Sequence, residues 1–551
     1  MSTRPRSSTA TIPAPFRRGR RINESQLGVA HSSPCRATLS RSPNDHRSIP
    51  MTDRDPRTTI VLEHAREFYV DGKWTTPADP GRTIEVLDST TEEPFLRVAE
   101  ATEEDISAAV AAARRAFDDG PWPRMAPSER AGYIRAFAQG IRDRAELFSE
   151  IWTRESGVLH STSEAGFEFV PAIYDRYADL AESFTFDEPA EITQGKGRFA
   201  LLRREPVGVV GAVAPWNAPV LLAAIKLGPA FAAGCTVVVK GSPEAPGNVN
   251  LMAEVADSIG LPPGVLNVVT ADREASEALV RDPRVDKIAF TGSTATGRRI
   301  AALCGERIAR YTLELGGKSA ALVLDDFDID EAARILSREE CFLSGQVCSS
   351  LTRIIVSRDR HDDLVDALTS TFSQVKVGDP FDADTEMGPL ISDRQRTRAL
   401  GLIERGRAEG AILTTGGGTP EHLDRGWFME PTVFARVDND SVLAREEIFG
   451  PVLSVLPADG EEDAIRIAND SIYGLNASVF TEDLDKAHDV LRRMRAGTAG
   501  HNDHHTDLGI AFGGYKQSGL GREGGREGLL PYLETKTLIL QGRPTAFDTE
   551  A

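Results

Sequence analysis

Cysteine is scarce in this chain of 551 residues. The five cysteines are far apart, and no two of them stand in a Cys-x-x-Cys motif: Cys35, Cys235, Cys304, Cys341 and Cys348. An odd number of scattered cysteines argues against a disulfide framework and against a cysteine-based zinc site. It is typical of a reducing compartment, so we expect a cytoplasmic protein.

Long hydrophobic runs are also missing. A membrane-spanning helix needs about 20 apolar residues, whereas the apolar run 207–214 already stops at Pro215.

The formal net charge of -20 disfavours nucleic acid and anionic membrane surfaces as partners. The 40% of hydrophobic residues favours a globular enzyme of two or three domains.

Acidic residues are nearly absent from the first fifty positions, which carry nine arginines against only Glu24 and Asp45. An arginine-rich, acid-poor start is typical of a targeting peptide. The alternative is a disordered leader from an upstream start codon, because Met51-Thr52-Asp53 has the character of a natural beginning. We favour the leader and place it at residues 1–55.

Recognisable metal-binding spacing is missing as well. His501, His504 and His505 stand close together around Asp503. Their spacing matches no known zinc motif, so we predict no metal site.

What the sequence does contain is an alternation of strand-like and helix-like segments. Strands are predicted at 207–214, 235–240, 265–269 and 286–290, and helices at 220–233, 247–259 and 274–281. After residue 350 the pattern continues with strands at 352–357, 434–437 and 451–456 and with helices at 361–374 and 392–409. Such alternation predicts an α/β fold with a parallel, doubly wound sheet.

Two local signals before the alternating segments predict the end of a strand and the start of a helix. Asp71-Gly72 predicts a turn after a strand. Thr102 and Asp105 have the spacing of a capping box and predict the start of a helix.

Glycine-rich segments suggest where a nucleotide would bind. Residues 290–297 (FTGSTATG) lie between a predicted strand and a helix, where backbone amides face phosphate groups. Gly519, Gly521 and Gly524 also match Gly-x-Gly-x-x-Gly, but no strand is predicted before them and little chain follows. We therefore assign the nucleotide to the first segment and dismiss the second.

Two motifs carry a nucleophile and a base. Glu314 lies in LELGGK and Cys348 in GQVCSS, and glycines accompany both. A cysteine thiolate attacks carbonyl carbon, and a nearby carboxylate activates the water that releases the product. The alternatives are a small buried cysteine and a solvated surface glutamate.

Taken together, the motifs resemble the aldehyde dehydrogenase superfamily over about residues 60–545. The resemblance rests on PWN at 215–217, Lys240, FTGST at 290–294, LELGGK at 313–318, GQVC at 345–348, EIFGP at 447–451 and FGGYKQSG at 512–519. It implies a Rossmann-like NAD(P)-binding domain (56–182 and 207–315), an α/β catalytic domain (316–533) and a small β oligomerisation arm (183–206 and 534–545).

The resemblance also implies the catalytic roles. Cys348 would attack the aldehyde, and the amide of Asn217 would stabilise the oxyanion together with the Cys348 backbone N–H. Hydride transfer would leave a thioester, which water activated by Glu314 would hydrolyse. Lys226 resembles a proton-relaying lysine of the family, and its alternative is a solvated helix lysine.

Cofactor contacts follow in the same way. Lys240 would contact the adenosine ribose, Ser293 the pyrophosphate and Glu447 the nicotinamide ribose, with Phe449 near the ring. The remaining expected cofactor contacts are Pro215, Trp216, Ser242, Glu244, Gly292 and Leu315.

One departure from the family pattern concerns the choice of nucleotide. The family's usual ribose-binding Glu, three residues after the lysine, is replaced by Pro243, and Glu244 follows. A carboxylate here binds the ribose 2′-hydroxyl and repels a 2′-phosphate. We predict NAD, with NADP possible.

The substrate is predicted from the same kind of departure. Ala218 and Thr506 stand where many relatives carry aromatic residues. A wider tunnel would suit a bulky or medium to long apolar aldehyde.

The oligomeric state is predicted from the tail. The strand 536–541 has no evident partner in its own domain, so we expect a homodimer or homotetramer.

Two other functions remain open. A coenzyme A-acylating relative would be similar in fold, but such branches usually lack the Glu found at position 314. A cofactor-independent cysteine esterase would need a partner histidine, and no histidine lies near either motif in the sequence.

Overall fold

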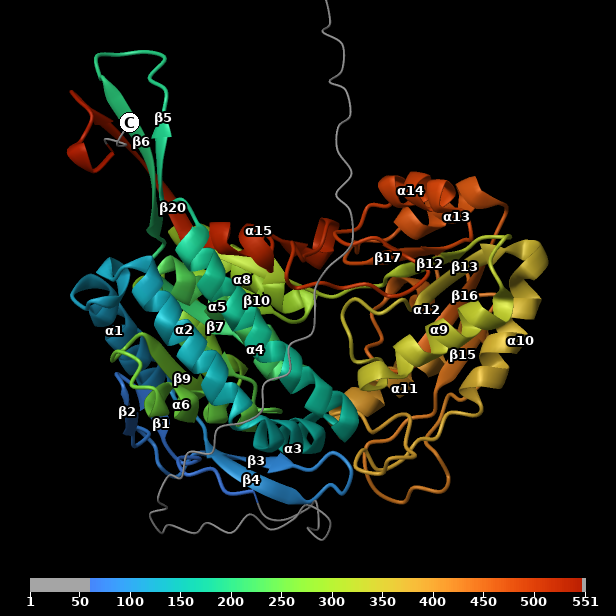
Figure 1. Cartoon of the computed structure of the whole chain (residues 1–551). Coiled ribbons are helices and arrows are strands. Elements are labelled where there is room, and N and C mark those ends of the chain that lie inside the picture. The colour runs from blue at the N-terminus through green and yellow to red at the C-terminus, as the bar shows by residue number, and fades with distance from the viewer. Residues whose placement is uncertain (1–59, 548–551) are drawn as a thin grey trace, which may run out of the picture. The chain divides into compact units, whose positions relative to one another are not determined.

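Residues 60–547 are described by the computed structural model of the protein (Figure 1). The predicted leader and Cys35 lie outside these residues. No helix within the described range is long and apolar enough to span a membrane.

The first sheet has eight strands in the order β19-β11-β10-β7-β8-β9-β1-β2. Its five central strands are parallel, and β1, β2 and β19 pair antiparallel at the two edges. In chain order the strands are β1 (Phe68–Val70), β2 (Lys73–Thr75), β7 (Val209–Val213), β8 (Thr236–Gly241), β9 (Leu266–Thr270), β10 (Lys287–Thr291), β11 (Arg310–Glu314) and β19 (Gly519–Leu520). This parallel core confirms the predicted fold class.

Helices cover both faces of this sheet because its central strands are apolar on both sides. One face carries α1 (Glu103–Asp118), α7 (Arg273–Arg281) and α8 (Thr294–Arg307). The other face carries α2 (Pro127–Arg142), α3 (Ala145–Ser156), α4 (His160–Ser183), α5 (Pro219–Ala233) and α6 (Gly247–Ser258). A hairpin of β3 (Thr83–Leu87) and β4 (Pro94–Ala99) packs beside α3.

The second sheet has seven strands in the order β14-β15-β16-β13-β12-β17-β18. The strands are β12 (Ala320–Val323), β13 (Arg353–Ser357), β14 (Ile412–Thr415), β15 (Thr432–Ala435), β16 (Val452–Ala458), β17 (Ala477–Phe480) and β18 (Gly500–His501). All neighbours pair in parallel except β14 with β15.

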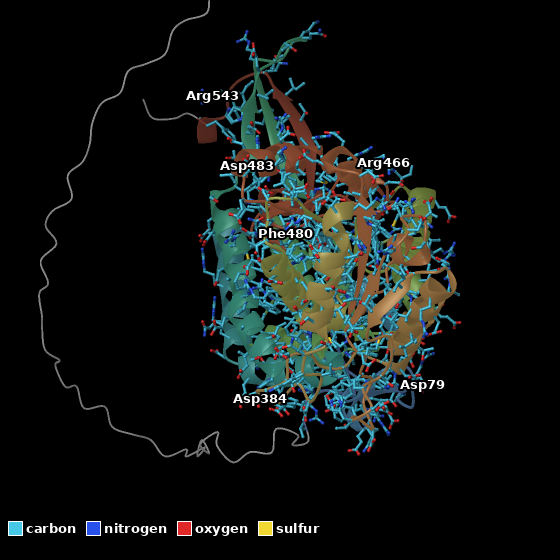
Figure 2. The ribbon with its side chains drawn as sticks, turned by 90° about the vertical axis from the view of Figure 1, so that its right-hand side faces the viewer. Asp79, Asp384, Arg466, Phe480, Asp483 and Arg543 are labelled. Atoms are coloured by element: carbon cyan, nitrogen blue, oxygen red, sulfur yellow. The ribbon has the colours of Figure 1, made fainter. Side chains whose placement is uncertain are left out.

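Helices also surround this second sheet on both faces. One core lies under α9 (Ile329–Cys341) and α10 (His361–Phe372). The opposite core lies under α11 (Asp393–Ala408), α12 (Val442–Arg445), α13 (Glu461–Asn469) and α14 (Leu484–Arg493). Of the residues labelled in Figure 2, Phe480 on β17 is fully buried, whereas Arg466 and Asp384 are exposed.

A three-stranded arm projects from the first sheet's helices (Figure 1). It consists of β5 (Asp187–Ala190), β6 (Phe199–Pro206) and β20 (Leu533–Leu540), all antiparallel. The tail strand therefore has a partner within its own chain, and the expectation of an unpaired strand was wrong. β20 pairs with β6 across its whole length, a pairing between distant segments that local sequence cannot reveal.

Most predicted elements agree closely with the structure. The helices at 220–233, 247–259 and 274–281 and the strands at 265–269 and 286–290 are displaced by at most one residue at either end. Larger displacements occur at the strand predicted at 434–437, which begins at Thr432 and ends at Ala435, and at the tail strand predicted at 536–541, which begins at Leu533 and ends at Leu540. The short α15 (Gly525–Leu529) follows the dismissed Gly-x-Gly-x-x-Gly match.

Candidate active site

The site lies at the carboxyl edge of the first sheet, where the strand order reverses. From β7 the chain adds β8 and β9 on one side and then returns to add β10 and β11 on the other. A crevice opens at such a switch point, and ligands of doubly wound sheets bind there. Residues 215–217 follow β7, and residues 292–293 follow β10.

A cavity of about 210 Å³ gathers most of the predicted site residues at this edge. Ten of them line it: Pro215, Trp216, Asn217, Gly292, Ser293, Glu314, Leu315, Cys348, Glu447 and Phe449. Gln395 and Arg398, from the first turns of α11, complete its wall. Lys226, Lys240, Ser242 and Glu244 do not line this cavity.

Cys348 follows a tightly bent loop. After α9 the chain passes through Leu343, Ser344 and Gly345, all with positive φ. A Cβ at Gly345 would lie 2.4 Å from the backbone of Gly450, so glycine is needed there. The Ser344 hydroxyl fixes the bend by donating to the Gly388 carbonyl at 2.8 Å.

The Cys348 thiol is half-buried near the carboxyl groups of Glu447 and Glu314. Burial, and then the carboxylates of Glu447 and Glu314, raise its pKa to about 12. The thiol is therefore protonated at neutral pH, and its attack requires a proton acceptor.

Asn217 is held beside the loop of the thiol. Its side-chain amide donates to the Gln346 carbonyl at 2.9 Å. The Trp152 indole N–H of α3 donates to the Asn217 carbonyl at 2.9 Å, so the backbone is also fixed. An amide group has two N–H donors, so one remains for a developing oxyanion.

Glu314 ends β11 and is only 3% exposed. Neither of its carboxylate oxygens has a hydrogen-bond partner among the described residues. Burial first, and the neighbouring Glu523 second, raise its pKa well above the ordinary value. A buried carboxylate with free lone pairs beside a thiol is suited to bind and deprotonate a water molecule.

Lys226 is 0% exposed on α5, so the alternative of a solvated lysine was wrong. Its ammonium donates to the Thr291 hydroxyl at 2.6 Å and to the Glu523 carboxylate at 2.8 Å.

Glu523 was missed by the sequence reasoning. It lies inside the segment that matched Gly-x-Gly-x-x-Gly, and dismissing that motif also set aside the glutamate between its glycines.

Glu447, which is expected to contact the nicotinamide ribose, is held in place in the cavity by the backbone. Glu447 accepts from the Gly317 backbone N–H at 2.9 Å, and burial raises its pKa to about 7. A Cβ at Gly316 would lie 2.4 Å from the Glu447 carboxylate. The absence of a side chain at 316 therefore leaves room for this group.

The turn after Glu447 is fixed by α11. Arg398 donates to the Glu447 carbonyl, and Gln395 donates to the Phe449 carbonyl. The Phe449 ring packs edge-on against Trp216, with ring centroids 5.2 Å apart.

A dinucleotide fits this edge of the sheet. The N-terminus of α8, a helix of 14 residues, opens at Ser293 and offers backbone N–H groups to a pyrophosphate. The Lys240 ammonium is buried, and burial lowers its pKa to about 8. A buried lysine and a helix N-terminus are suited to an anionic ligand.

The residues expected at the adenosine ribose form a hydrogen-bonded group. The Ser242 hydroxyl donates to Glu244, and Arg394 of α11 forms an ion pair with the same carboxylate. Glu244 is therefore held between the first sheet and the first turn of α11.

No histidine lies near Cys348 in the sequence, but the fold brings His504 into contact with Ser349, the residue that follows Cys348. His504 hydrogen-bonds through Nε2 with the Ser349 hydroxyl at 3.0 Å, and its Nδ1 lies 3.6 Å from Glu339. The His501 ring hydrogen-bonds with the Thr481 carbonyl, and the His505 ring hydrogen-bonds with the His501 carbonyl. Within the described range, no group of three or more His, Cys, Asp or Glu residues is arranged to hold a metal ion.

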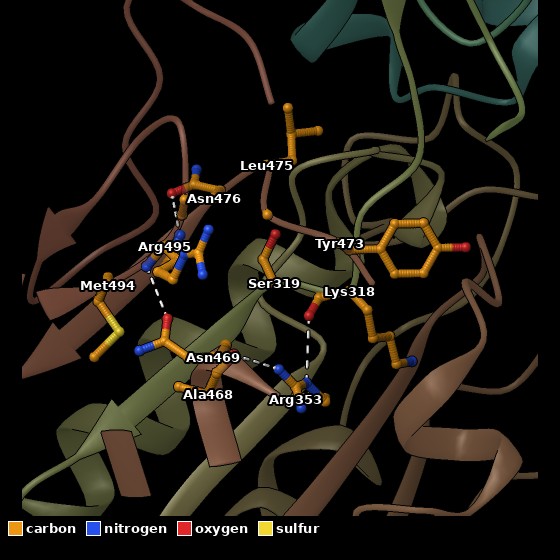
Figure 3. Close-up of a pocket in the computed structure, with 14 residues that line it drawn as sticks. Lys318, Ser319, Arg353, Ala468, Asn469, Tyr473, Leu475, Asn476, Met494 and Arg495 are labelled. Carbon is orange, nitrogen blue, oxygen red and sulfur yellow. Dashed lines mark hydrogen bonds between the residues drawn. The ribbon is translucent and has the colours of Figure 1, made fainter. Parts of the chain in front are cut away.

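A second cavity, of about 20 Å³, lies behind the LELGGK motif (Figure 3). Lys318, Ser319 and Arg353 are among its lining residues, and the Lys318 carbonyl accepts from Arg353 at 3.3 Å. The space suffices for about one water molecule, so this cavity is too small for a substrate.

Comparison with known proteins agrees with this geometry. Residues 74–538 match the model of the aldehyde dehydrogenase family. A geranial dehydrogenase of Castellaniella defragrans is 42% identical over 484 residues, which cover 88% of this chain and 100% of the relative.

Solved structures agree equally well. A Mycobacterium tuberculosis aldehyde dehydrogenase complexed with NAD+ is 43% identical, with a TM-score of 0.84 over 88% of this chain and 99% of that one. A mutant of aldehyde dehydrogenase C from Pseudomonas syringae, complexed with NAD+ and octanal, is 36% identical, with a TM-score of 0.84 over 89% and 99%.

Proposed function

Because the chain belongs to the aldehyde dehydrogenase family, we propose that it oxidises an aldehyde to the free carboxylic acid with NAD. The observation that carries this proposal is the shared cavity, in which the Cys348 thiol and the unpartnered Glu314 carboxylate both lie. A nucleophile and a base in one cavity suit the formation and hydrolysis of a thioester.

The first half of the cycle belongs to Cys348. The thiol gives its proton to the Glu314 carboxylate in the same cavity, and its sulfur attacks the aldehyde carbon as the carbonyl electron pair moves to the oxygen. The resulting thiohemiacetal oxygen is stabilised by the Asn217 amide and the Cys348 backbone N–H. Bound NAD would supply the hydride acceptor for the step that leaves the thioester on Cys348. Glu447, Ser293 and Lys240 would hold it, with Phe449 and Trp216 beside the ring.

The second half belongs to Glu314. Its unpartnered oxygens bind a water molecule and remove a proton as the water attacks the thioester carbon. The acid leaves, and the thiol is restored. We assign the relay of the proton away from Glu314 to Lys226, whose charge acts on Glu314 although no direct hydrogen bond joins the two groups.

The substrate class is a bulky or medium to long apolar aldehyde. Ala218 is buried at the start of α5 and presents only a methyl group there. The relatives support this class, because one is named a geranial dehydrogenase and another was crystallised with octanal.

We include three further points in this proposal. The domain boundaries are those expected from the sequence, the chain forms a homo-oligomer through the arm, and the protein is cytoplasmic. The arm supports the second of these, because β5 and β20 each leave one strand edge without a partner among the described strands.

The cycle is tested by absorbance at 340 nm with NAD and a panel running from acetaldehyde to octanal and an aromatic aldehyde. We expect NADH to form, with kcat/KM highest for the larger apolar aldehydes, and Cys348→Ala to abolish the signal. Cys304→Ala is the matched control, because Cys304 is buried on α8 away from the cavity. A clear preference for acetaldehyde would refute the substrate class.

Hydrolysis is tested with Glu314→Gln. Loss of the base should reduce steady-state turnover by about 100-fold or more, while a pre-steady-state burst of NADH survives because the thioester still forms. Turnover that stays unchanged would remove Glu314 from this role. Rescue of wild-type turnover only by coenzyme A would favour the acylating reaction instead.

A cysteine esterase is disfavoured by the described contacts. His504 is hydrogen-bonded to Ser349, and among the described residues no histidine hydrogen-bonds to the Cys348 thiol. Hydrolysis of an ester without added nucleotide, together with no NADH from any aldehyde, would favour it.

A further inference from the structure

A buried carboxylate on α9 has no part in the catalytic cycle described above. Glu340 lies on the buried face of the helix together with apolar residues such as Ala333 and Leu336, and it is only 1% exposed. Fully buried glutamates are rare, because taking a carboxylate out of water is costly unless hydrogen bonds compensate. The partners of Glu340 therefore indicate its role.

Glu340 connects two segments of the site. One of its carboxylate oxygens accepts from the Ser350 hydroxyl at 2.7 Å, and the other accepts from the Val452 backbone N–H at 3.2 Å. Ser350 closely follows Cys348, and Val452 begins β16 shortly after Glu447. The carboxylate thus links the segment that carries the nucleophile to the segment that carries the expected nicotinamide-ribose contact.

The nucleophile lies in a β-turn that ends at Ser350. The Ser350 backbone N–H donates to the Val347 carbonyl at 3.2 Å, so Cys348 and Ser349 are the central residues of the turn. Fixing the Ser350 side chain therefore fixes the end of this turn. The direction of the Cys348 N–H, which the proposed function assigns to the oxyanion, depends on the same turn.

The two segments also meet before the nucleophile. A Cβ at Gly345 would lie 2.4 Å from the backbone of Gly450, so the two backbones are in direct contact there. Glu340 supplies the second connection, after Cys348 in the chain. The nucleophile is therefore attached to the Glu447 segment on both sides, once by backbone contact and once through the buried carboxylate.

A buried ammonium favours the ionised form of this carboxylate. Burial raises the pKa of Glu340 to about 8, whereas the Ser350 hydrogen bond and the charge of Lys318 lower it. Lys318 (Figure 3) is 3% exposed, and its Nζ has no hydrogen-bond partner among the described residues. Its charge acts on Glu340 first and also on Glu447. An ionised Glu340 has acceptors for both of its donors.

Resting on the proposed function, we propose that Glu340 is a positioning residue that aligns the Cys348 turn with the Glu447 segment. Glu340 is not among the residues that line the catalytic cavity, so it acts through Ser350 and Val452. Its task is to keep the carbon bound to Cys348 in line with a nucleotide held at Glu447. Without it the same groups remain in the cavity, but their mutual arrangement is looser.

The test separates alignment from binding and from folding. The variants of the full chain are Glu340→Ala, Glu340→Gln and Ser350→Ala. Glu331→Ala is the matched control, because Glu331 is an exposed glutamate in the first turn of the same helix. The measurements are the rate of the pre-steady-state NADH burst, the Kd of NAD by calorimetry, the thermal unfolding temperature, and the rate at which iodoacetamide alkylates Cys348 without nucleotide.

We expect Glu340→Ala and Ser350→Ala to slow the burst about tenfold while the Kd of NAD changes by less than about twofold. A looser turn exposes the half-buried thiol, so alkylation should become at least about threefold faster. Glu340→Gln should return both rates to near the wild-type values, because its amide oxygen accepts from Val452 and its NH₂ group donates to the Ser350 hydroxyl. Glu331→Ala should behave as wild type does.

Three results would overturn the positioning role: a wild-type burst in folded Glu340→Ala or Ser350→Ala, a Glu340→Gln variant as slow as Glu340→Ala, and a loss of NAD affinity as large as the loss in burst rate. If Glu340→Ala does not fold, Ser350→Ala decides, because it removes a single oxygen atom. Absence of NADH formation by wild type would refute the proposed function. The alkylation rates, which need neither aldehyde nor nucleotide, would then still decide the positioning role.

Discussion

Lys226 and Glu523 form a fully buried ion pair beside the base, and this pair modifies the pKa of Glu314, which burial raises most. The Glu523 charge raises the pKa of Glu314, after burial, and the Lys226 charge lowers it. Because the base must be ionised to accept a proton, thioester hydrolysis should be slow below the pKa of Glu314 and increase as the pH rises through it.

Replacing Glu523 by Gln should therefore shift the acidic limb of the hydrolysis profile to lower pH. The variant removes a negative neighbour of Glu314 and leaves the positive Lys226, so the ionised base becomes easier to form. The measurement is the steady-state rate from roughly pH 5 to roughly pH 9.

The stability of this variant must be followed as well. A buried ion pair that loses one partner costs about 3–5 kcal/mol of unfolding free energy, so thermal unfolding is measured alongside the rate. An acidic limb that stays in place in a folded Glu523→Gln protein would contradict the assigned coupling.

Some residues of the site could be predicted from the sequence, and others could not. Cys348 and Glu314 stand in motifs whose flanking glycines have visible steric reasons, such as the contact of Gly345 with Gly450. Glu523 and His504 have no such local mark. Their importance arises from contacts with residues 297 and 155 positions away, respectively.

At the scale of elements, the loop between β11 and β12 places both carboxylates of the site. Glu314 is the last residue of β11. Gly316 and Gly317 follow and lie beside Glu447, which precedes β16 of the second sheet. A side chain at 316 would meet the Glu447 carboxylate at 2.4 Å.

Gly316→Ala should therefore displace Glu447 while leaving the fold intact, because only the flexible end of a side chain has to move. We expect NAD to bind at least about tenfold more weakly, which corresponds to a loss of about 1.4 kcal/mol. Calorimetric titration with NAD checks this.

Gly401→Ala on the exposed face of α11 is the control, because a Cβ there meets nothing within 4 Å. It should bind NAD normally and gain up to about 1 kcal/mol of stability from helix propensity. Equal NAD affinity in both variants would contradict the placement of Glu447 at the nucleotide.

Elements with strong local signals were predicted well. Thr102 caps α1 through the predicted box with Asp105, and Asp71-Gly72 turns β1 into β2 with positive φ at both residues. The strand predicted at 434–437 was displaced, because Arg436 has a positive φ of 51° that ends the strand at Ala435, and pairing with β16 begins already at Thr432. Pairing partners, and not composition, set such boundaries.

At the scale of the whole molecule, two sheets contribute to one cavity and a distant strand completes the arm. β20 gives β6 a full antiparallel partner, so the long edge of β6 is protected. An exposed edge of this length promotes association with other chains.

A chain shortened to residue 532 loses the free β20 edge proposed to join subunits and exposes the edge of β6. It should therefore no longer elute as the full chain does in size-exclusion chromatography, and it should aggregate. A chain shortened to residue 544 keeps β20 and serves as the control, which should elute as the full chain does. Identical elution and unfolding temperature of both shortened chains would contradict a protective role of β20.

The distance along the chain between Lys226 and Glu523 also has a consequence during protein synthesis. At about 5–20 residues per second, Glu523 leaves the ribosome roughly 15–60 s after Lys226. Until then Lys226 lacks the carboxylate that neutralises it in the folded protein, so the buried ion pair beside Glu314 can be completed only late in translation.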